Sequence, residues 1–351
     1  MAPVIYELKR YSEQVQPVIC VTAQHREMLD QILKWFEITP DYDLNLMQDN
    51  QSLPEITTRV MTAISDLLER LQPDIALVQG DTTSAMVTAL AAFYQRIPVG
   101  HIEAGLRTRD RYSPFPEEIN RRQISVLSTY HFAPTVTAVK ALQSEGILPE
   151  NIFHTGNTVI DALLMTIAKE IPFEIPSPSD GRKLILVTAH RRENFGHPLE
   201  QICFALRELA RFHEDIEIVY PVHQNPNVYE PVSRLLKDEK RIELLPPLSY
   251  PEFVHLMARS YLILTDSGGV QEEAPSLGKP VLVLRDTTER PEAIEAGTAK
   301  LIGTERERIV DEVNVLLDSE TAWRNMARRI NPFGDGRAAE RIVGVLMKES
   351  R

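Results

Sequence analysis

The stretch Tyr261–Glu292 decides the fold, and it reads YLILTDSGGVQEEAPSLGKPVLVLRDTTERPE. It begins with the apolar, strand-favouring residues 261–265, which run into Asp-Ser-Gly-Gly. A helix-compatible segment comes next, and Gly278 and Pro280 then lead into a second apolar strand at 281–284. The stretch therefore predicts a strand, a turn, a helix and a further strand in succession.

The turn between that first strand and the helix predicts an anion-binding site. Gly268 and Gly269 let the backbone approach a ligand closely, and the start of a helix offers free N–H groups and the positive end of its dipole. A phosphate is the anion that we expect there. The alternative is a well-capped helix without a ligand, in which Asp266 or Ser267 is the N-cap.

The residues after the turn favour a nucleotide. Glu272 and Glu273 lie one to two turns into the expected helix, where a carboxylate could bind a ribose diol beside the phosphate. Arg285 and Arg290 follow the second strand, at the carboxyl edge where open α/β sheets bind their ligands. Two cations beside a phosphate-binding turn favour the ligand-binding interpretation over the capped helix.

The rest of the chain alternates strands with helices, which predicts an α/β protein with doubly wound parallel sheets. Expected strands lie at 18–22, 75–79, 99–102, 131–133, 152–155, 184–188, 216–220, 242–245, 261–265, 281–284 and 299–302. Expected helices lie at 1–11, 23–36, 56–71, 85–94, 117–127, 137–145, 161–170, 306–318, 320–330 and 338–348. The segment IPFEIPSPSDGRK (171–183) is typical of a linker between domains. We expect one domain at 1–170 plus 338–351, because the last helix could return to it, and another at 171–337.

The composition of this 351-residue chain argues against several classes of binding partner and cofactor. Its formal net charge of -12 argues against nucleic acid and against an anionic membrane. Only Cys20 and Cys203 are present, so we expect neither a disulfide framework nor a thiolate metal site, and a cytoplasmic location. No apolar run is long enough to span a bilayer. No cluster has metal-ligand spacing and no G-x-G-x-x-G follows a strand, so neither a metal nor NAD is expected.

Three carboxylates predict proton-transfer chemistry. Asp81 and Glu103 each follow an expected strand, so they are placed at adjacent carboxyl ends of a parallel sheet. Glu117 lies in SPFPEE at the start of the next helix, and Glu118 beside it is interpreted as a structural or solvent-facing residue. Each carboxylate alone is more often an N-cap or a surface ion pair, but three at one sheet edge favour a catalytic role.

Basic side chains are expected near the same strand ends. Arg121 lies one helical turn after Glu117, where it could pair with that carboxylate or reach a diphosphate. His190 follows a strand and is next to Arg191, which favours ligand contact over a histidine that only satisfies the core. His223 occupies an equivalent edge.

The order of these segments resembles that of one family. LTDSGGVQEEAPSLGKPVLVLRDTTERPEA (264–293) resembles the hallmark of the non-hydrolysing UDP-N-acetylglucosamine 2-epimerases, and the resemblance spans essentially the whole chain. The other matching motifs are QGDTT (79–83), GHIEAGLRT (100–108), SPFPEEINR (113–121), TGNTVIDAL (155–163), TAHRREN (188–194) and YPVHQNPNV (220–228). The resemblance implies two Rossmann-like domains that face each other across a cleft, the glycosyltransferase-B architecture, and a homodimer.

The resemblance also implies a reaction without a cofactor, the interconversion of UDP-N-acetylglucosamine and UDP-N-acetylmannosamine for envelope polysaccharide synthesis. Because the hydrogen on C2 is hardly acidic, the family is understood to expel UDP by anti elimination and add it back to 2-acetamidoglucal. This scheme needs carboxylates for proton transfer and cations for the diphosphate. The implied catalytic residues are Asp81, Glu103, Glu117, Arg121 and His190, and the implied UDP-binding residues are Ser267, Gly268, Gly269, Glu273, Arg290 and Phe253. For Phe253, a place in the core is the rival interpretation.

Two further expectations rest on the resemblance. Gln24, Arg191 and His223 match positions of a second site where UDP-N-acetylglucosamine acts as an allosteric activator, although MQDNQ (47–51) lacks the arginine that some members carry there. In the family a first strand and a loop of the form GTRPEAIK precede the equivalent of Met1. We therefore expect a truncated first domain without its N-terminal strand, and weakened activity. A glycosyltransferase of the same architecture, a hydrolysing epimerase and a sugar-nucleotide-binding protein with little turnover stay open as alternatives.

Overall fold

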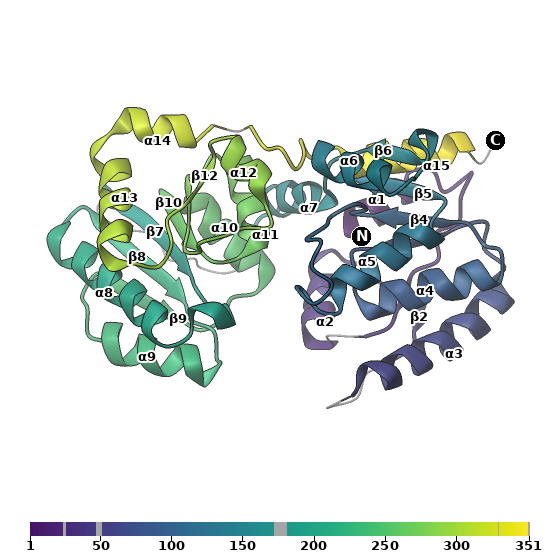
Figure 1. Cartoon of the computed structure of the whole chain (residues 1–351), viewed down its shortest axis with the longest axis horizontal. Helices are drawn as coiled ribbons and strands as arrows, with labels where there is room; N and C mark the ends of the chain where they lie inside the picture. Colours follow the sequence, from purple (N-terminus) through teal and green to yellow (C-terminus); the bar gives the residue numbers. More distant parts are fainter. Residues whose placement is uncertain (24–25, 47–50, 172–180, 329, 350–351) are drawn as a thin grey trace. The chain divides into compact units, whose positions relative to one another are not determined.

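The chain folds into two compact units. The computed structural model describes residues 1–23, 26–46, 51–171, 181–328 and 330–349. The first unit is Met1–Ala162 with Phe333–Arg351, and the second is Leu163–Pro332. The expected domain boundaries, at residues 170 and 337, lie a few residues further along the chain than these. Each unit is built around a parallel sheet with helices on its faces (Figure 1).

The first unit contains a four-stranded parallel sheet in the order β3-β4-β5-β6 and a separate parallel pair, β1-β2. Its strands are β1 (Cys20–Val21), β2 (Tyr42–Asp43), β3 (Ala76–Gln79), β4 (Val99–Ile102), β5 (Tyr130–Ala133) and β6 (Ile152–His154). Its helices are α1 (Ala2–Lys9), α2 (Arg26–Trp35), α3 (Leu53–Leu71), α4 (Thr83–Tyr94), α5 (Glu117–Leu127), α6 (Val136–Ser144), η1 (Pro149–Asn151) and α15 (Ala338–Glu349), and α7 (Thr158–Ile167) crosses the boundary between the units.

Helices cover both faces of this sheet. On one face α3, α4 and α5 pack against Val78 and Val99. On the other face α1 and α15 pack against Ile102 and Phe132 (Figure 1). Because burial on both faces hides the strands, ligands can reach this sheet at its carboxyl edge, where β3 and β4 end.

The second unit contains a six-stranded parallel sheet in the order β12-β11-β10-β7-β8-β9. Its strands are β7 (Lys183–Thr188), β8 (Ile216–Pro221), β9 (Ile242–Leu245), β10 (Leu262–Thr265), β11 (Val281–Val283) and β12 (Ala299–Leu301). Its helices are η3 (Arg192–Asn194), α8 (His197–Phe212), α9 (Pro226–Leu236), α10 (Tyr250–Arg259), α11 (Gly268–Glu273), η4 (Ala274–Leu277), α12 (Pro291–Glu295), α13 (Arg306–Asp318) and α14 (Glu320–Met326).

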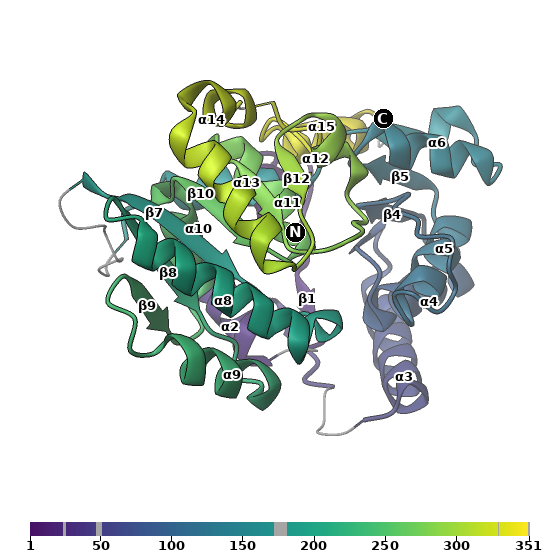
Figure 2. The ribbon, with the colours of Figure 1, turned by 60° about the vertical axis from the view of Figure 1, so that its left-hand side comes forward.

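Alternate residues of the central strands build the main core of this unit. Ile185 and Val187 of β7 and Leu262 and Leu264 of β10 pack with α8, α9 and α13, since successive side chains of a strand point to opposite faces. Figure 2 shows α8 and α13 on one side of the strands and α10 on the other. The central strands are therefore apolar on both faces, and their carboxyl ends carry the polar residues.

The expected alternation of strands and helices and the parallel sheets are confirmed. Each expected strand overlaps an observed one, although the strand expected at 18–22 is only Cys20–Val21. Between the helices expected at 23–36 and 56–71 the structure contains β2, whose two residues are too few to show a periodic pattern. The helix expected at 320–330 ends at Met326, and residues 172–180 of the expected linker lie outside the described residues.

No described helix combines the length and the apolar character that crossing a bilayer requires. No group of three or more described His, Cys, Asp or Glu side chains has the proximity needed to hold a metal ion.

Asp161 fastens the last helix to the first unit. It lies in α7, and its carboxylate accepts hydrogen bonds from the backbone N–H groups of Ala338 (3.2 Å) and Ala339 (2.8 Å) at the start of α15. Burial raises the pKa of this carboxyl, while the two hydrogen bonds lower it. Asp161 therefore caps α15 from another helix, in the way that an N-cap residue does locally.

We predict that Asp161→Ala lowers the free energy of unfolding by about 1–2 kcal/mol, because two buried N–H groups lose their acceptor. Urea denaturation followed by circular dichroism measures this loss. Glu340→Ala is the control, since it breaks an exposed ion pair between this helix and Arg337, the residue just before it, and should cost nothing measurable. Equal losses in the two variants would contradict the capping role.

Candidate active site

The turn after β10 contains the buried carboxylate of Asp266, which does not cap the following helix, α11. Asp266 is fully buried, and its Oδ2 accepts hydrogen bonds from the backbone N–H groups of His190 and Arg191, both at 2.8 Å, and from Nδ2 of Asn194 at 3.0 Å. Ser267 occupies the N-cap position of α11, but its side chain makes no capping hydrogen bond. The N-cap is therefore Ser267, one of the two residues expected there, but neither its side chain nor that of Asp266 caps the helix.

Two arginines flank this turn. A Cβ atom added to Gly268 would lie 3.6 Å from Nη2 of Arg191 and 4.0 Å from Cζ of Arg290. Nε of Arg290 pairs with the carboxylate of Glu272 in α11, and Nη1 of Arg191 lies 3.7 Å from Oε1 of Glu289. The Gly-Gly turn therefore has two guanidinium groups beside it, each held by one carboxylate.

Arg285 has a structural role in the same region. Its side chain is almost completely buried, and it donates to Glu193 at 2.6 Å and to both carboxylate oxygens of Glu289 at 2.8 Å and 3.1 Å. These hydrogen bonds lower the pKa of Glu289 to about 2, so Glu289 stays ionised beside Arg191. Arg285 thus anchors the carboxylate that holds Arg191, and each of its three nitrogens already donates to one of these carboxylates.

His190 and His223 lie together at the carboxyl ends of β7 and β8. Their rings stack at 5.5 Å between centroids and 27° between planes. Nδ1 of His223 accepts from the backbone N–H of Asn225 at 3.0 Å, so its Nε2 is the nitrogen available to a ligand. Neighbouring parallel strands thus bring two expected ligand contacts side by side.

Glu273 lies in α11, and its side chain is buried instead of exposed to solvent. It is 6% exposed, and its Oε1 accepts a hydrogen bond from the hydroxyl of Tyr250 at 2.9 Å. Burial, with a smaller contribution from the charge of Glu272, raises the pKa of Glu273 to about 7, against the lowering effect of the Tyr250 bond. Phe253 lies in the same helix as Tyr250 and is only half-buried, so it is not a core phenylalanine.

Two of the expected acids of the first unit, Asp81 and Glu103, follow the neighbouring strands β3 and β4, as predicted. Oδ2 of Asp81 accepts a hydrogen bond from Arg121 at 2.5 Å, and Nδ2 of Asn120 donates to the backbone carbonyl of Asp81 at 2.9 Å. Arg121 also lies 3.4 Å from Glu118. The pairing of Arg121 with Glu117 that the helix spacing suggested is therefore replaced by pairs with Asp81 and Glu118.

Glu103 occupies an unusual backbone position beside the turn that carries Asp81. Its φ is 68°, in the left-handed region that residues other than glycine seldom adopt. A Cβ atom added to Gly80 would lie 3.8 Å from its Oε2. His101 is fully buried behind both turns, with Nε2 2.8 Å from the carbonyl of Gly80, and burial lowers its pKa to about 3. A neutral imidazole therefore braces this edge of the sheet.

The two adjacent glutamates at the start of α5 have opposite surroundings. Glu118 is 1% exposed, and it accepts from the backbone N–H groups of Thr108 at 3.0 Å and Arg109 at 3.2 Å. The structural role expected of Glu118 is the one observed. Glu117 is half-buried, and among the described residues its side chain makes no hydrogen bond and no ion pair.

Several residues that hold the candidate site residues in place were not predicted from the sequence. Asp266 was considered only as an N-cap, and neither His101 nor Tyr250 was singled out. The Asp that ends a strand just before a Gly-Gly turn is a usable signal, whereas the supports from Tyr250 and His101 depend on contacts across the fold. Gln24, one of the expected allosteric residues, lies outside the described residues.

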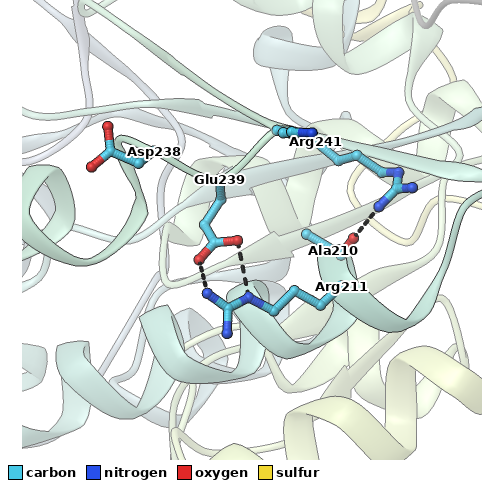
Figure 3. Close-up of a pocket in the computed structure, with 6 residues that line it drawn as sticks. Ala210, Arg211, Asp238, Glu239 and Arg241 are labelled. Atoms are coloured by element: carbon cyan, nitrogen blue, oxygen red, sulfur yellow. Dashed lines mark hydrogen bonds and ion pairs between the residues drawn. The ribbon is translucent and has the colours of Figure 1, made fainter.

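A separate hollow lies at the end of α8 and contains none of the expected site residues. Figure 3 shows that Arg211 pairs there with Glu239 and that Arg241 donates to the carbonyl of Ala210. Lys240 and Asp238 complete the lining. This hollow lies away from the strand ends described above, which hold the expected site residues, so the candidate site stays there.

Comparison with known proteins identifies the family. The family model described as UDP-N-acetylglucosamine 2-epimerase matches residues 7–347. The UDP-N-acetylglucosamine 2-epimerase of Escherichia coli (strain K12) is 54% identical over 355 residues, which cover 99% of this chain and 94% of that protein.

Solved structures give the same result. The UDP-GlcNAc 2-epimerase from Neisseria meningitidis bound to UDP-GlcNAc matches with a TM-score of 0.89 and 50% identity, over 99% of this chain and 96% of that one. The Methanocaldococcus jannaschii enzyme in complex with UDP-GlcNAc and UDP matches with a TM-score of 0.78 and 33% identity, over 99% and 95%. The expected architecture of two Rossmann-like domains is confirmed by these relatives. The chain belongs to the UDP-N-acetylglucosamine 2-epimerase family, in its non-hydrolysing branch.

Proposed function

We propose that this protein is an isomerase that interconverts UDP-N-acetylglucosamine and UDP-N-acetylmannosamine, a step that supplies precursors for envelope polysaccharide. The observation that carries the proposal is the turn at Gly268, where two guanidinium groups flank a Gly-Gly strand end as a diphosphate requires. The relatives that share the fold include epimerases solved with UDP-GlcNAc and with UDP.

The proposed chemistry is elimination followed by re-addition. A base removes the C2 proton while the C1–O bond to UDP breaks, which leaves 2-acetamidoglucal and UDP. UDP then adds back to C1 as a proton is delivered to the other face of C2. The cycle is redox-neutral and needs no cofactor, because the same proton count and the same leaving group return to the product.

Carboxylates of the first unit are the proposed proton-transfer groups. Glu117 is suited to this role because no described side chain holds its carboxylate. Glu103 projects from a turn whose left-handed backbone sets its direction. Asp81 is paired with Arg121 at 2.5 Å, which orients its carboxylate.

Cations of the second unit are the proposed partners of the departing diphosphate. Arg290 and Arg191 flank Gly268, and the ring of His190 stacks on His223 at the neighbouring strand end. Negative charge grows on the diphosphate as the C1–O bond breaks, so donors already in place stabilise the transition state more than the ground state. Ser267 and Gly269 complete the turn. A role for Gln24, Arg191 and His223 at an allosteric site stays a prediction.

The nucleoside is proposed to lie against α10 and α11. Glu273 would accept hydrogen bonds from the ribose hydroxyls, and the half-buried ring of Phe253 would flank the uracil.

We also propose a cytoplasmic homodimer, with the exposed Phe93, Tyr94 and Val126 on the packed helices α4 and α5 as its contact. Sedimentation velocity measures that state, and a monomer at micromolar concentration would contradict it.

Turnover in deuterated water tests the proposed reaction. With UDP-N-acetylglucosamine as the only substrate, we expect UDP-N-acetylmannosamine that carries deuterium at C2 in the proton NMR spectrum. The label follows because the returning proton comes from a carboxyl that exchanges with solvent. Epimerised product without deuterium contradicts the mechanism. Release of free sugar, or no turnover until an acceptor is added, contradicts the reaction itself.

Replacing the proposed acids by amides should separate chemistry from binding. We expect Asp81→Asn, Glu103→Gln and Glu117→Gln each to lower kcat by about 10²–10⁴-fold, the usual contribution of a positioned acid or base. Calorimetry should find the Kd for UDP within about twofold of wild type, since these groups face the sugar. Glu150→Gln, which changes an exposed carboxylate between α6 and β6, is the control and should leave both constants unchanged. Small effects in all three variants would reject the assignment.

UDP binding should depend on pH through Glu273. Its pKa of about 7 lies above the ordinary 4.5, so the carboxyl loses its proton as the pH rises from 6 to 8. Only the ionised form accepts from both ribose hydroxyls, so UDP affinity should rise across this range. The diphosphate also titrates near pH 6, and Glu273→Gln isolates that contribution. The ratio of wild-type to variant affinity should therefore grow from pH 6 to pH 8 in calorimetry, and a constant ratio would contradict the ribose contact.

A further inference from the structure

Asp266 was expected as a possible N-cap of α11, but its carboxylate binds a different part of the chain. It follows β10, but all three hydrogen bonds to its Oδ2 come from the turn that follows β7. The backbone N–H of Asp266 donates to the carbonyl of Thr188 at 3.0 Å, so the residue joins the two strand ends through both its backbone and its side chain.

The turn that it holds, residues 189–194, carries His190 and Arg191. Their consecutive backbone N–H groups point inward at the carboxylate, which occupies the anion-binding concavity that such N–H pairs form. These N–H groups are therefore not available to a ligand. The turn can contact a diphosphate only through its side chains, whose directions depend on how the backbone is held.

We propose that Asp266 is a positioning residue for the diphosphate: its buried carboxylate fixes the 189–194 turn so that the side chains of His190 and Arg191 meet the ligand at Gly268. This inference rests on the proposed function. Arg191 already lies within 3.6 Å of the Cβ position of Gly268, and the ring of His190 is already stacked on His223. A turn without this anchor would have to order these groups at the moment of binding.

Other contacts show what Asp266 adds. The hydroxyl of Tyr220 donates to the carbonyl of Ala189 at 2.6 Å, and Asn194 donates to the carbonyl of Leu284 at 3.2 Å. They hold the two ends of the turn, whereas the N–H groups of His190 and Arg191 are bound by Asp266. Its second oxygen, Oδ1, is buried and accepts no hydrogen bond from the described residues. A charge that is kept buried and half-satisfied would be costly as a simple filler of the core.

Two variants and one control test the inference by calorimetry with UDP and UMP. Asp266→Asn keeps one acceptor oxygen but loses the charge, and charge-assisted hydrogen bonds are about twice as strong as neutral ones. We expect it to raise the Kd for UDP by about threefold to tenfold. Asp266→Leu removes the acceptor, and we expect a rise of about tenfold to a hundredfold. Tyr220→Phe removes one hydrogen bond to the same turn but leaves the carboxylate, and its Kd should change by less than about twofold.

The stoichiometry of UDP binding distinguishes a positioning role of Asp266 from a role in the stability of the fold alone. If Asp266 positions the turn, the variants bind one UDP per chain with a raised Kd, and the preference for UDP over UMP shrinks because the lost contacts are to the diphosphate. If Asp266 only stabilises the fold, the Kd stays at the wild-type value while the fraction of chains that bind falls, which overturns the inference. Should Asp266→Leu fail to fold, Asp266→Asn alone decides: a Kd for UDP within twofold of wild type overturns the inference.

The wild-type protein distinguishes the two levels of proposal. If it binds no UDP, the proposed function fails and the inference fails with it. If it binds UDP and epimerises while the Asp266 variants bind UDP and UMP as wild type does, the inference alone fails.

Discussion

The parallel pairing of β7 with β10 is the constraint on which the candidate site of the second unit depends. It sets Thr188 opposite Thr265, so the turns that follow the two strands begin at the same level of the sheet. The hydroxyls of these threonines share a hydrogen bond of 2.7 Å, and Oγ1 of Thr265 also accepts from the backbone N–H of Ser267. One residue further along, Asp266 can reach across to the neighbouring turn. A register shift by one residue would turn these side chains to the other face.

Opposite charges hold the candidate cations in place before any ligand is considered. Arg290 is paired with Glu272, Arg191 lies near Glu289, and Arg121 is paired with Asp81. An acidic protein of net charge -12 can bind a diphosphate only where such cations are gathered locally. The carboxylate partners keep each guanidinium oriented, and their attraction offsets part of the free-energy cost of removing the cation from water. Diphosphate binding then exchanges one set of charge-assisted hydrogen bonds for another, which suits a ligand that must leave C1 and return in every cycle.

Much of this arrangement could be predicted from the sequence, because parallel sheets place their ligands at strand ends and strand ends are visible as apolar runs followed by polar residues. Asp81, Glu103 and His190 were located in this way. The partners of these residues could not be predicted, since they come from elements distant in the chain. Asp266 illustrates the difference: its position before Gly268 suggested a cap, while its actual partners lie about 75 residues away in sequence. Local spacing predicts contacts within one helix, and tertiary pairing overrides it.

Glu117 and Glu118 show why adjacent and chemically identical residues need the structure to be told apart. Successive residues of a helix point about 100° apart, so two neighbours can have different surroundings. Glu118 faces the interior, and two backbone N–H groups and Arg121 satisfy its buried carboxylate. That arrangement fastens Thr108 and Arg109 to α5 and places Arg121 where it also holds Asp81. Glu117 points elsewhere and keeps its carboxylate unbound among the described residues. Glu118 thus holds the neighbouring residues in place, whereas Glu117 keeps the carboxylate lone pairs that proton transfer requires.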